Sequence, residues 1–231
     1  MLDWRKHKII IIQILKDIYQ NPLISPWLGF KGGTAAYLFY GLPRYSVDLD
    51  FDLLDIGKKE NVFVEVKKIV EKYGKIKDEM IKENTILLEI SYGDQEHNIK
   101  IEISTRQLKN NFEILNYLGI PMQVMAKEDI FANKLLALTS RRKTATRDIF
   151  DVYFFLSKRW DFNRQAVIDR SGKNIKDYLA ECIKFAEGVN NQNILMGLGE
   201  LVDEKQKDWI KKNLKNEVLF YLKNYQTMLE E

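Results

Sequence analysis

The sequence has little cysteine, little histidine and no long apolar run. Cys182 is the only cysteine among 231 residues, which excludes a disulfide within the chain and fits a reducing compartment, so we expect a cytoplasmic protein. His7 and His97 are the only histidines, too few for a histidine-rich zinc site. No apolar run approaches the roughly 18 residues that a membrane span needs. The formal charge of +3 is small, so any attraction for nucleic acid must come from local patches.

The N-terminal stretch, residues 1–20, places basic residues before apolar ones, as a signal peptide does. Gln13 and Lys16 interrupt the apolar run, and no small-residue cleavage site follows it. The apolar positions also fit one face of an amphipathic helix. We therefore predict a helix over 3–19 that ends before the proline-containing stretch "NPLISP".

Short strands and helices alternate up to about residue 125. The clearest strand pattern lies over 98–105, where three isoleucines alternate with Lys100, Glu102 and Ser104 and predict one buried and one charged face. The same reasoning predicts further strands over 27–30, 48–53, 74–81 and 85–92, with helices over 34–40 and 60–73.

From Glu128 onward the pattern favours helices alone, predicted over 128–140, 147–157, 174–187 and 204–229. The fold class is therefore predicted as α+β, with a mixed sheet and flanking helices followed by a helical C-terminal region. We divide the chain into a mixed α/β N-terminal part over 1–125 and a helical C-terminal part over 126–231. Gly119-Ile120-Pro121 is the predicted joint between them.

Three aspartates, Asp48, Asp50 and Asp52, occupy alternate positions of the strand predicted over 48–53. Alternation places them on one face, about 6 to 7 Å apart, where like charges destabilise the fold unless water, cations or basic side chains compensate them. A solvated edge face is one interpretation. Glu102, on the polar face of another strand, favours a second one. If the two strands are neighbours, the carboxylates form a cluster of the kind that binds Mg²⁺ and substrate phosphate.

A glycine turn precedes this strand. Gly32-Gly33-Thr34 lies between a predicted strand and a predicted helix, where backbone N–H groups can approach an anion and the helix N-terminus favours negative charge. Phosphate is the obvious anion. Glycine pairs also serve backbone geometry alone, so the turn by itself does not decide between these roles.

These residues carry a resemblance to a known family. "KGGTAAYLFYGLPRYSVDLDF" resembles the first motif of the nucleotidyltransferase superfamily (DNA polymerase β-like), in which a G-[GS] turn precedes an Asp-x-Asp strand. Its Gly-Gly-Thr form and the Arg-x-Ser-x-Asp approach are similar to the AbiEii/AbiGii toxin family. That family also has an Asp-x4-Lys motif and a later aspartate-bearing helix, matched here by "DIFANK", Asp129–Lys134, and "RDIFD", Arg147–Asp151. Where the superfamily usually has serine, this chain has Gly33 followed by Thr34.

The resemblance implies an enzyme that uses Mg²⁺ or Mn²⁺ to move a nucleoside monophosphate from an NTP to an acceptor hydroxyl, releasing pyrophosphate. It implies Asp48 and Asp50 as metal ligands. Glu102 completes the set and is the best candidate to activate the acceptor hydroxyl, a role that Asp50 or a metal-bound hydroxide could share. It also implies a catalytic domain over 1–125 and a helical domain over 126–231 that completes the active-site cleft. Nucleotide contacts are expected from Gly32, Gly33, Thr34 and Lys134. Asp52 has no assigned task.

Other charged residues have two interpretations each. Arg44 and Ser46 either contact phosphate or shape the loop before the acidic strand. Asp148 and Asp151, three apart on one helix face, either stabilise the start of their helix or orient Lys134. Together with Asp129 they are expected to support the site.

The acceptor stays open. The resemblance implies the toxin component of a two-gene toxin–antitoxin system with a cognate antitoxin, acting on RNA such as the 3′ end of tRNA. The basic run Arg141-Arg142-Lys143 is compatible with an RNA backbone. A protein or small-molecule acceptor fits the same active site, and a non-catalytic nucleotide- or antitoxin-binding module is the alternative from another class.

Overall fold

A computed structural model gives the fold of residues 3–93, 97–140 and 146–229. The chain divides into two compact units. The sheet unit comprises Met1–Gly41 and Tyr45–Ala126, and the helical unit comprises Leu42–Arg44 and Lys127–Glu231. The chain therefore enters the helical unit briefly at 42–44, returns, and enters it again after Ala126. The expected α+β class is confirmed.

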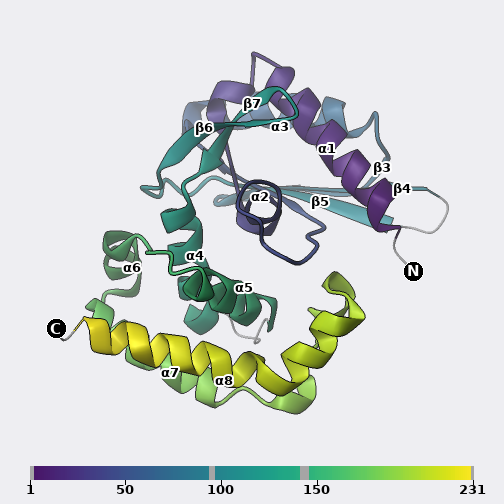
Figure 1. Ribbon diagram of the computed structural model, residues 1–231. Helices are drawn as coiled ribbons and strands as arrows, with labels where there is room; N and C mark the ends of the chain where they lie inside the picture. The colour runs from purple at the N-terminus through teal and green to yellow at the C-terminus, as the bar shows by residue number, and fades with distance from the viewer. Residues whose placement is uncertain (1–2, 94–96, 141–145, 230–231) are drawn as a thin grey trace. The chain divides into compact units, whose positions relative to one another are not determined.

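Over the described residues, the sheet unit contains a mixed seven-stranded sheet in the order β3-β4-β5-β2-β1-β7-β6 (Figure 1). β2 pairs in parallel with β5, and β1 in parallel with β7, while the other neighbours are antiparallel. The strands are β1 (Leu28–Lys31), β2 (Leu49–Leu53), β3 (Lys75–Ile81), β4 (Thr85–Tyr92), β5 (His97–Ser104), β6 (Phe112–Tyr117) and β7 (Ile120–Met125).

Helices cover the apolar face of this sheet. They are α1 (Trp4–Gln20), α2 (Gly32–Phe39) and α3 (Lys59–Val70), with the short 3₁₀ turns η1 (Ser25–Trp27) and η2 (Ile56–Lys58). Tyr19 of α1 lies against Phe51, and Phe39 of α2 lies near Phe30, with ring centroids 6.5 and 6.3 Å apart. Since Phe30 and Phe51 pair across β1 and β2, both helices pack on the face that these rings share. The opposite face carries the charged residues.

The predicted N-terminal helix is confirmed as α1. Asp3 caps it by accepting the backbone N–H groups of Arg5 and Lys6. Its buried stripe of Ile11, Ile14, Leu15 and Ile18 faces the core, as an amphipathic pattern requires.

The helical unit contains α4 (Lys127–Ser140), α5 (Thr146–Ser157), α6 (Arg164–Ser171), α7 (Ile175–Glu187) and α8 (Glu204–Met228), with the 3₁₀ turns η3 (Asn191–Asn193) and η4 (Gly199–Leu201). The long α8, yellow in Figure 1, lies beside α7 and also contacts α5. α6 was not predicted, because its largely polar sequence has no apolar stripe. Asn163 is its N-cap, because its side-chain oxygen accepts a hydrogen bond from the backbone N–H of Ala166. No helix in the part of the chain that the structure describes is long and apolar enough to cross a membrane.

The β6–β7 hairpin corrects the predicted joint. Gly119-Ile120-Pro121 does not connect two domains: Leu118 and Gly119, both with positive φ, form a two-residue turn inside the sheet unit. Neither β6 nor β7 was predicted. Pro121 lies near the start of β7, where a proline within an apolar run argues against a strand. The boundary between the units comes after Ala126.

Candidate active site

The glycine turn lies directly against Asp50. Gly32 begins α2 with φ +79°, a conformation that favours glycine, and a Cβ added there would overlap the Asp50 carboxylate. Two separate constraints therefore require glycine at position 32. The helix N-terminus, which suits an anion, and a strand carboxylate, which suits a cation, occupy the same place in the sheet unit.

Glu102 lies opposite Asp50 across two neighbouring strands. β2 and β5 pair in parallel, with Asp50 in register with Glu102. Paired residues point to the same face, and neighbouring strands lie about 4.8 Å apart. Glu102 is exposed and Asp50 is half-buried. The sheet thus brings together the two carboxylates that the sequence placed on separate strands.

Asp48 lies just before β2 rather than within it, which corrects the strand predicted over 48–53. The pairing of β2 with β5 begins at Leu49, so the ladder does not reach Asp48. The backbone carbonyl of Asp48 instead accepts a hydrogen bond from the Thr34 hydroxyl. Thr34 is buried, and its side chain thus supports the backbone at Asp48.

Asp52, which had no assigned task, belongs to a buried polar cluster. It is 3% exposed, and its carboxylate lies 2.5 Å from the Lys31 ammonium and accepts from the Asn110 amide at 2.7 Å. Lys31 was missed although it stands directly before the glycine turn, and no local signal marks Asn110. The cluster balances the Asp52 charge and anchors β1 and the segment after β5 to the strand that carries Asp50.

The carboxylates suit a metal shared with a substrate better than an all-protein cage. Across residues 3–93, 97–140 and 146–229, no group of three or more His, Cys, Asp or Glu side chains is gathered closely enough to hold an ion. Asp48, Asp50 and Glu102 therefore do not form a closed three-carboxylate site. Mg²⁺ needs less from the protein, because it is usually held by one or two carboxylates together with waters and substrate phosphates. Asp50 beside a helix N-terminus fits such a site.

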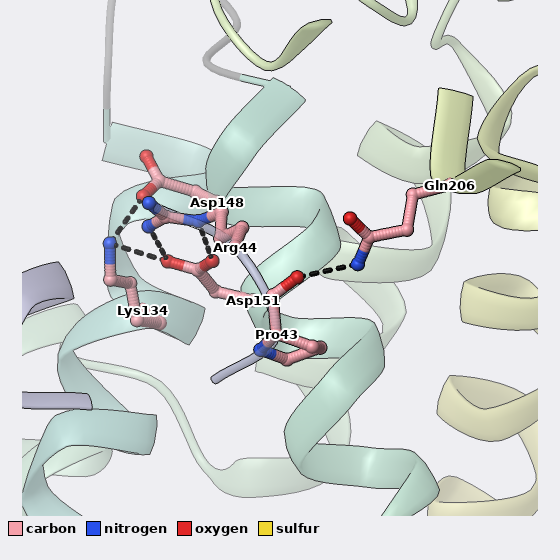
Figure 2. Close-up of polar contacts among 6 residues, drawn as sticks. All are labelled: Pro43, Arg44, Lys134, Asp148, Asp151 and Gln206. Atoms are coloured by element: carbon pink, nitrogen blue, oxygen red, sulfur yellow. Dashed lines mark hydrogen bonds and ion pairs between the residues drawn. The ribbon is translucent and has the colours of Figure 1, made fainter. Parts of the chain in front are cut away.

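The helical unit contains a buried ion network, shown in Figure 2. Arg44 donates from Nε and Nη2 to the two carboxylate oxygens of Asp151, at 2.6 and 2.7 Å. The two residues are 4% and 0% exposed. Pro43 adds a second contact for the same segment, because its carbonyl accepts from the side-chain amide of Gln206 (Figure 2). Of the two interpretations of Arg44, this geometry matches a residue that shapes the loop.

Lys134 joins this network. Its ammonium lies 2.9 Å from Asp148 and 2.8 Å from Asp151, so two cations and two carboxylates balance one another. Asp148 and Asp151 both contact the Lys134 ammonium, as the interpretation in which they orient Lys134 requires. Burial by itself would raise the pKa of Asp151, but the charges and hydrogen bonds of Arg44 and Lys134 lower it to about 2. Asp151 is therefore ionised at neutral pH.

The remaining predicted residues have local roles or none that the contacts show. Asp129, buried in α4, accepts from the Asn163 amide at 2.8 Å and so fixes the start of α6. Ser46 is half-buried and lines a small cavity with Trp4 and Thr34. The basic run 141–143 lies outside the described residues.

Comparison with known proteins identifies the family. A model of the nucleotidyl transferase AbiEii toxin of type IV toxin–antitoxin systems matches residues 13–231. The chain belongs to the AbiEii family. The resemblance read from the sequence is confirmed, and this AbiEii member is a nucleotidyltransferase of the toxin type. The family's membership in toxin–antitoxin systems implies a cognate antitoxin, and nucleotidyltransferases generally use an NTP and a divalent metal.

Two solved structures from Helicobacter pylori share the AbiEii member's fold. One is a protein provisionally assigned as a nucleotidyltransferase, with a TM-score of 0.65 and 23% identity over 100% of this chain and 97% of that chain. The other is JHP933, with a TM-score of 0.59 and 21% identity over the same shares. At these identities the likeness supports the fold alone. No curated protein matches the chain.

Proposed function

We propose that the chain transfers a nucleoside monophosphate from an NTP to an acceptor hydroxyl. The observation that carries the proposal is the placement of Asp50, which lies against the Gly32 turn on one side and in register with Glu102 on the other. Catalysis of phosphoryl transfer depends mainly on positioning and on stabilising charge, and this group of residues is suited to both.

In the proposed reaction the acceptor oxygen attacks the α-phosphorus, the bond from the α-phosphorus to the bridging oxygen breaks, and pyrophosphate leaves. Glu102 is exposed and accepts the proton of the acceptor hydroxyl. Backbone N–H groups at the start of α2, from Gly32 to Thr34, bind the phosphates. Asp48 and Asp50 would hold Mg²⁺ or Mn²⁺, which supplies charge stabilisation to the attacking and leaving oxygens when bound.

For the helical unit we propose that Lys134 neutralises negative charge on the triphosphate. The support is its place in the Asp-x4-Lys motif of the family together with its position between two buried carboxylates, which hold the side chain in one orientation. Asp148 and Asp151 then act as supporting residues. Arg44 acts on the loop before Asp48 rather than on phosphate.

For the acceptor we propose RNA, with the 3′ end of tRNA as the specific candidate, and an antitoxin protein as the partner that restrains the enzyme. The support is a sequence feature, the basic run at 141–143, which is compatible with an RNA backbone. A protein acceptor is an outcome that the experiment separates from RNA, whereas a small-molecule acceptor would leave both RNA and protein unlabelled.

The test is incubation with each α-³²P-labelled NTP, Mg²⁺ and either total RNA or total protein from the host, followed by gel separation. We expect label on RNA from one preferred NTP, and loss of that label in Asp50→Asn and Glu102→Gln. Glu113→Gln is the matched control, because Glu113 is also an exposed strand glutamate. Label on protein alone would show that the acceptor is a protein and not RNA. Unchanged labelling by Asp50→Asn would refute the proposed site, and NTP binding without transfer by the wild type would favour the binding-module alternative.

A further inference from the structure

Two buried side chains hold the backbone that leads into β2. The carbonyl of Asp48 accepts from the Thr34 hydroxyl, and the preceding carbonyl, of Val47, accepts from Nε2 of His7 at 3.1 Å. Thr34 and His7 come from α2 and α1 and are each 1% exposed. The sheet ladder begins only at Leu49, so these bonds fix two successive peptide units that the ladder does not.

We propose that His7 is a positioning residue for Asp48. The inference rests on the proposed function, in which Asp48 is a metal ligand. His7 fixes the Val47 peptide, and because that peptide precedes Asp48, its orientation sets where the Asp48 side chain begins. His7 lies in α1, before residues 13–231 that the family model matches.

The contact with Val47 defines the hydrogen position at Nε2 of the ring. A carbonyl oxygen only accepts, so Nε2 must carry the hydrogen that it donates to Val47. The other nitrogen, Nδ1, makes a short contact with the Tyr92 hydroxyl. Burial raises the pKa of Tyr92 to about 12, so the phenol keeps its proton at neutral pH and can donate it to Nδ1. The neutral Nε2–H tautomer satisfies both contacts.

Solvent has little room to replace this bond. The cavity beside His7, lined also by Thr34 and Ser46, has a volume of about 10 Å³. That is at or below the space that one buried water needs. In the native structure, therefore, the imidazole and not solvent supplies the hydrogen bond to the Val47 carbonyl.

The first test is nitrogen-15 NMR of histidine-labelled protein. The sequence has two histidines, and His97→Gln removes the signals of the second, so those of His7 are assigned directly. We expect a protonated Nε2 and an unprotonated Nδ1. The opposite tautomer would overturn the proposal, whatever the activity.

The second test uses two amide variants of His7. In His7→Gln the side-chain NH₂ reaches the position of Nε2 and can donate to Val47, whereas in His7→Asn the amide is one methylene shorter and cannot. We measure Mn²⁺ binding in the presence of inorganic tripolyphosphate by electron paramagnetic resonance. The glutamine variant should stay within about threefold of the wild type, and the asparagine variant should bind about 10- to 100-fold more weakly, as loss of a residue that orients a metal ligand does.

Tyr92→Phe is the matched control, because it removes a partner of His7 without removing the bond to Val47, and its Mn²⁺ affinity should stay within about threefold of the wild type. Equal Mn²⁺ affinity in the glutamine and asparagine variants would overturn the positioning role, as would a wild type that binds no Mn²⁺. A wild type that binds Mn²⁺ in this His7-dependent way and yet transfers no nucleotide would refute the proposed function and leave the positioning role standing.

Discussion

In the Asp151→Asn variant, the helical unit should unfold at a much lower urea concentration than in the wild type. The carboxylate accepts two hydrogen bonds from Arg44 and lies 2.8 Å from the Lys134 ammonium. Asparagine has one acceptor oxygen and no charge, so the guanidinium would stay buried beside a weaker partner. Breaking a buried ion pair from one side costs about 3 to 5 kcal/mol. Because Asp148 still balances one of the two cations, we expect the lower end, about 3 kcal/mol.

Part of this stability depends on pH, in a direction that the network fixes. Burial opposes ionisation of Asp151, but Arg44 and Lys134 lower its pKa from 3.8 to about 2. A lowered folded-state pKa adds stability above the unfolded pKa, and that stability is lost as the pH falls from about 4 through 2. A shift of this size corresponds to about 2 kcal/mol. The difference between wild type and Asp151→Asn should therefore shrink by about 2 kcal/mol between pH 7 and pH 2.

Urea denaturation followed by tryptophan fluorescence measures both effects. Trp160 and Trp209 pack against aromatic residues of α5 and report on the helical unit. Replacing Trp4 and Trp27 with phenylalanine removes the signal of the sheet unit. Asp208→Asn is the control, since this aspartate of α8 is exposed and its replacement should change stability by less than about 0.5 kcal/mol. A loss below 1 kcal/mol for Asp151→Asn, or one that is the same at both pH values, would refute the reasoning.

Three further predictions follow from single positions. Gly32→Ala should lower nucleotide transfer on the order of 100-fold, because the added Cβ would displace Asp50. Gly41→Ala is the control: Gly41 also has a positive φ, but a Cβ there meets nothing within 4 Å, so the variant should lose only about 1 kcal/mol of stability. Equal transfer activity in the two variants would contradict this prediction. Cys182 is buried and burial raises its pKa to about 12, so iodoacetamide at pH 8 should modify it only after unfolding in urea, and rapid modification of the native protein would count against the structure. Leu118→Asn should stabilise the protein by about 0.5 kcal/mol, because asparagine tolerates the φ of 51° in the hairpin turn better than leucine does; a lower melting temperature would contradict it.

The face of the sheet that carries the candidate site followed from local rules. Alternation along β5 separated Ile101 from Glu102 onto opposite faces, and burial agrees. The glycine turn before α2 also read correctly, since a positive φ and a close approach are both signalled by glycine itself. The register that sets Glu102 opposite Asp50 was only a condition of the prediction, because strand pairing depends on contacts far apart in the chain.

What the sequence could not predict depends on such distant partners. Arg44 and Asp151 are 107 residues apart, and no local sequence pattern at either position indicates that they form an ion pair. His7 reaches Val47 across 40 residues, and a lone histidine in an amphipathic helix gives no sign of this. Pro121 misdirected the prediction of β7, because its missing N–H argues against a strand wherever the pairing is unknown.

The short excursion of the chain through Leu42–Arg44 has a consequence for how the protein can be taken apart or inherited. The boundary after Ala126 does not divide the sequence cleanly into the two units. Arg44 lies within the sequence of the sheet unit, yet it pairs with Asp151 of the helical unit. Cleavage after Ala126 would leave this cation and its carboxylate on different fragments of the chain. A recombination event that exchanged residues 127–231 between two such toxins would preserve the network only if both parents carried an arginine at the position of Arg44. Exchange of the helical unit is thus constrained by one residue encoded more than eighty positions upstream of it.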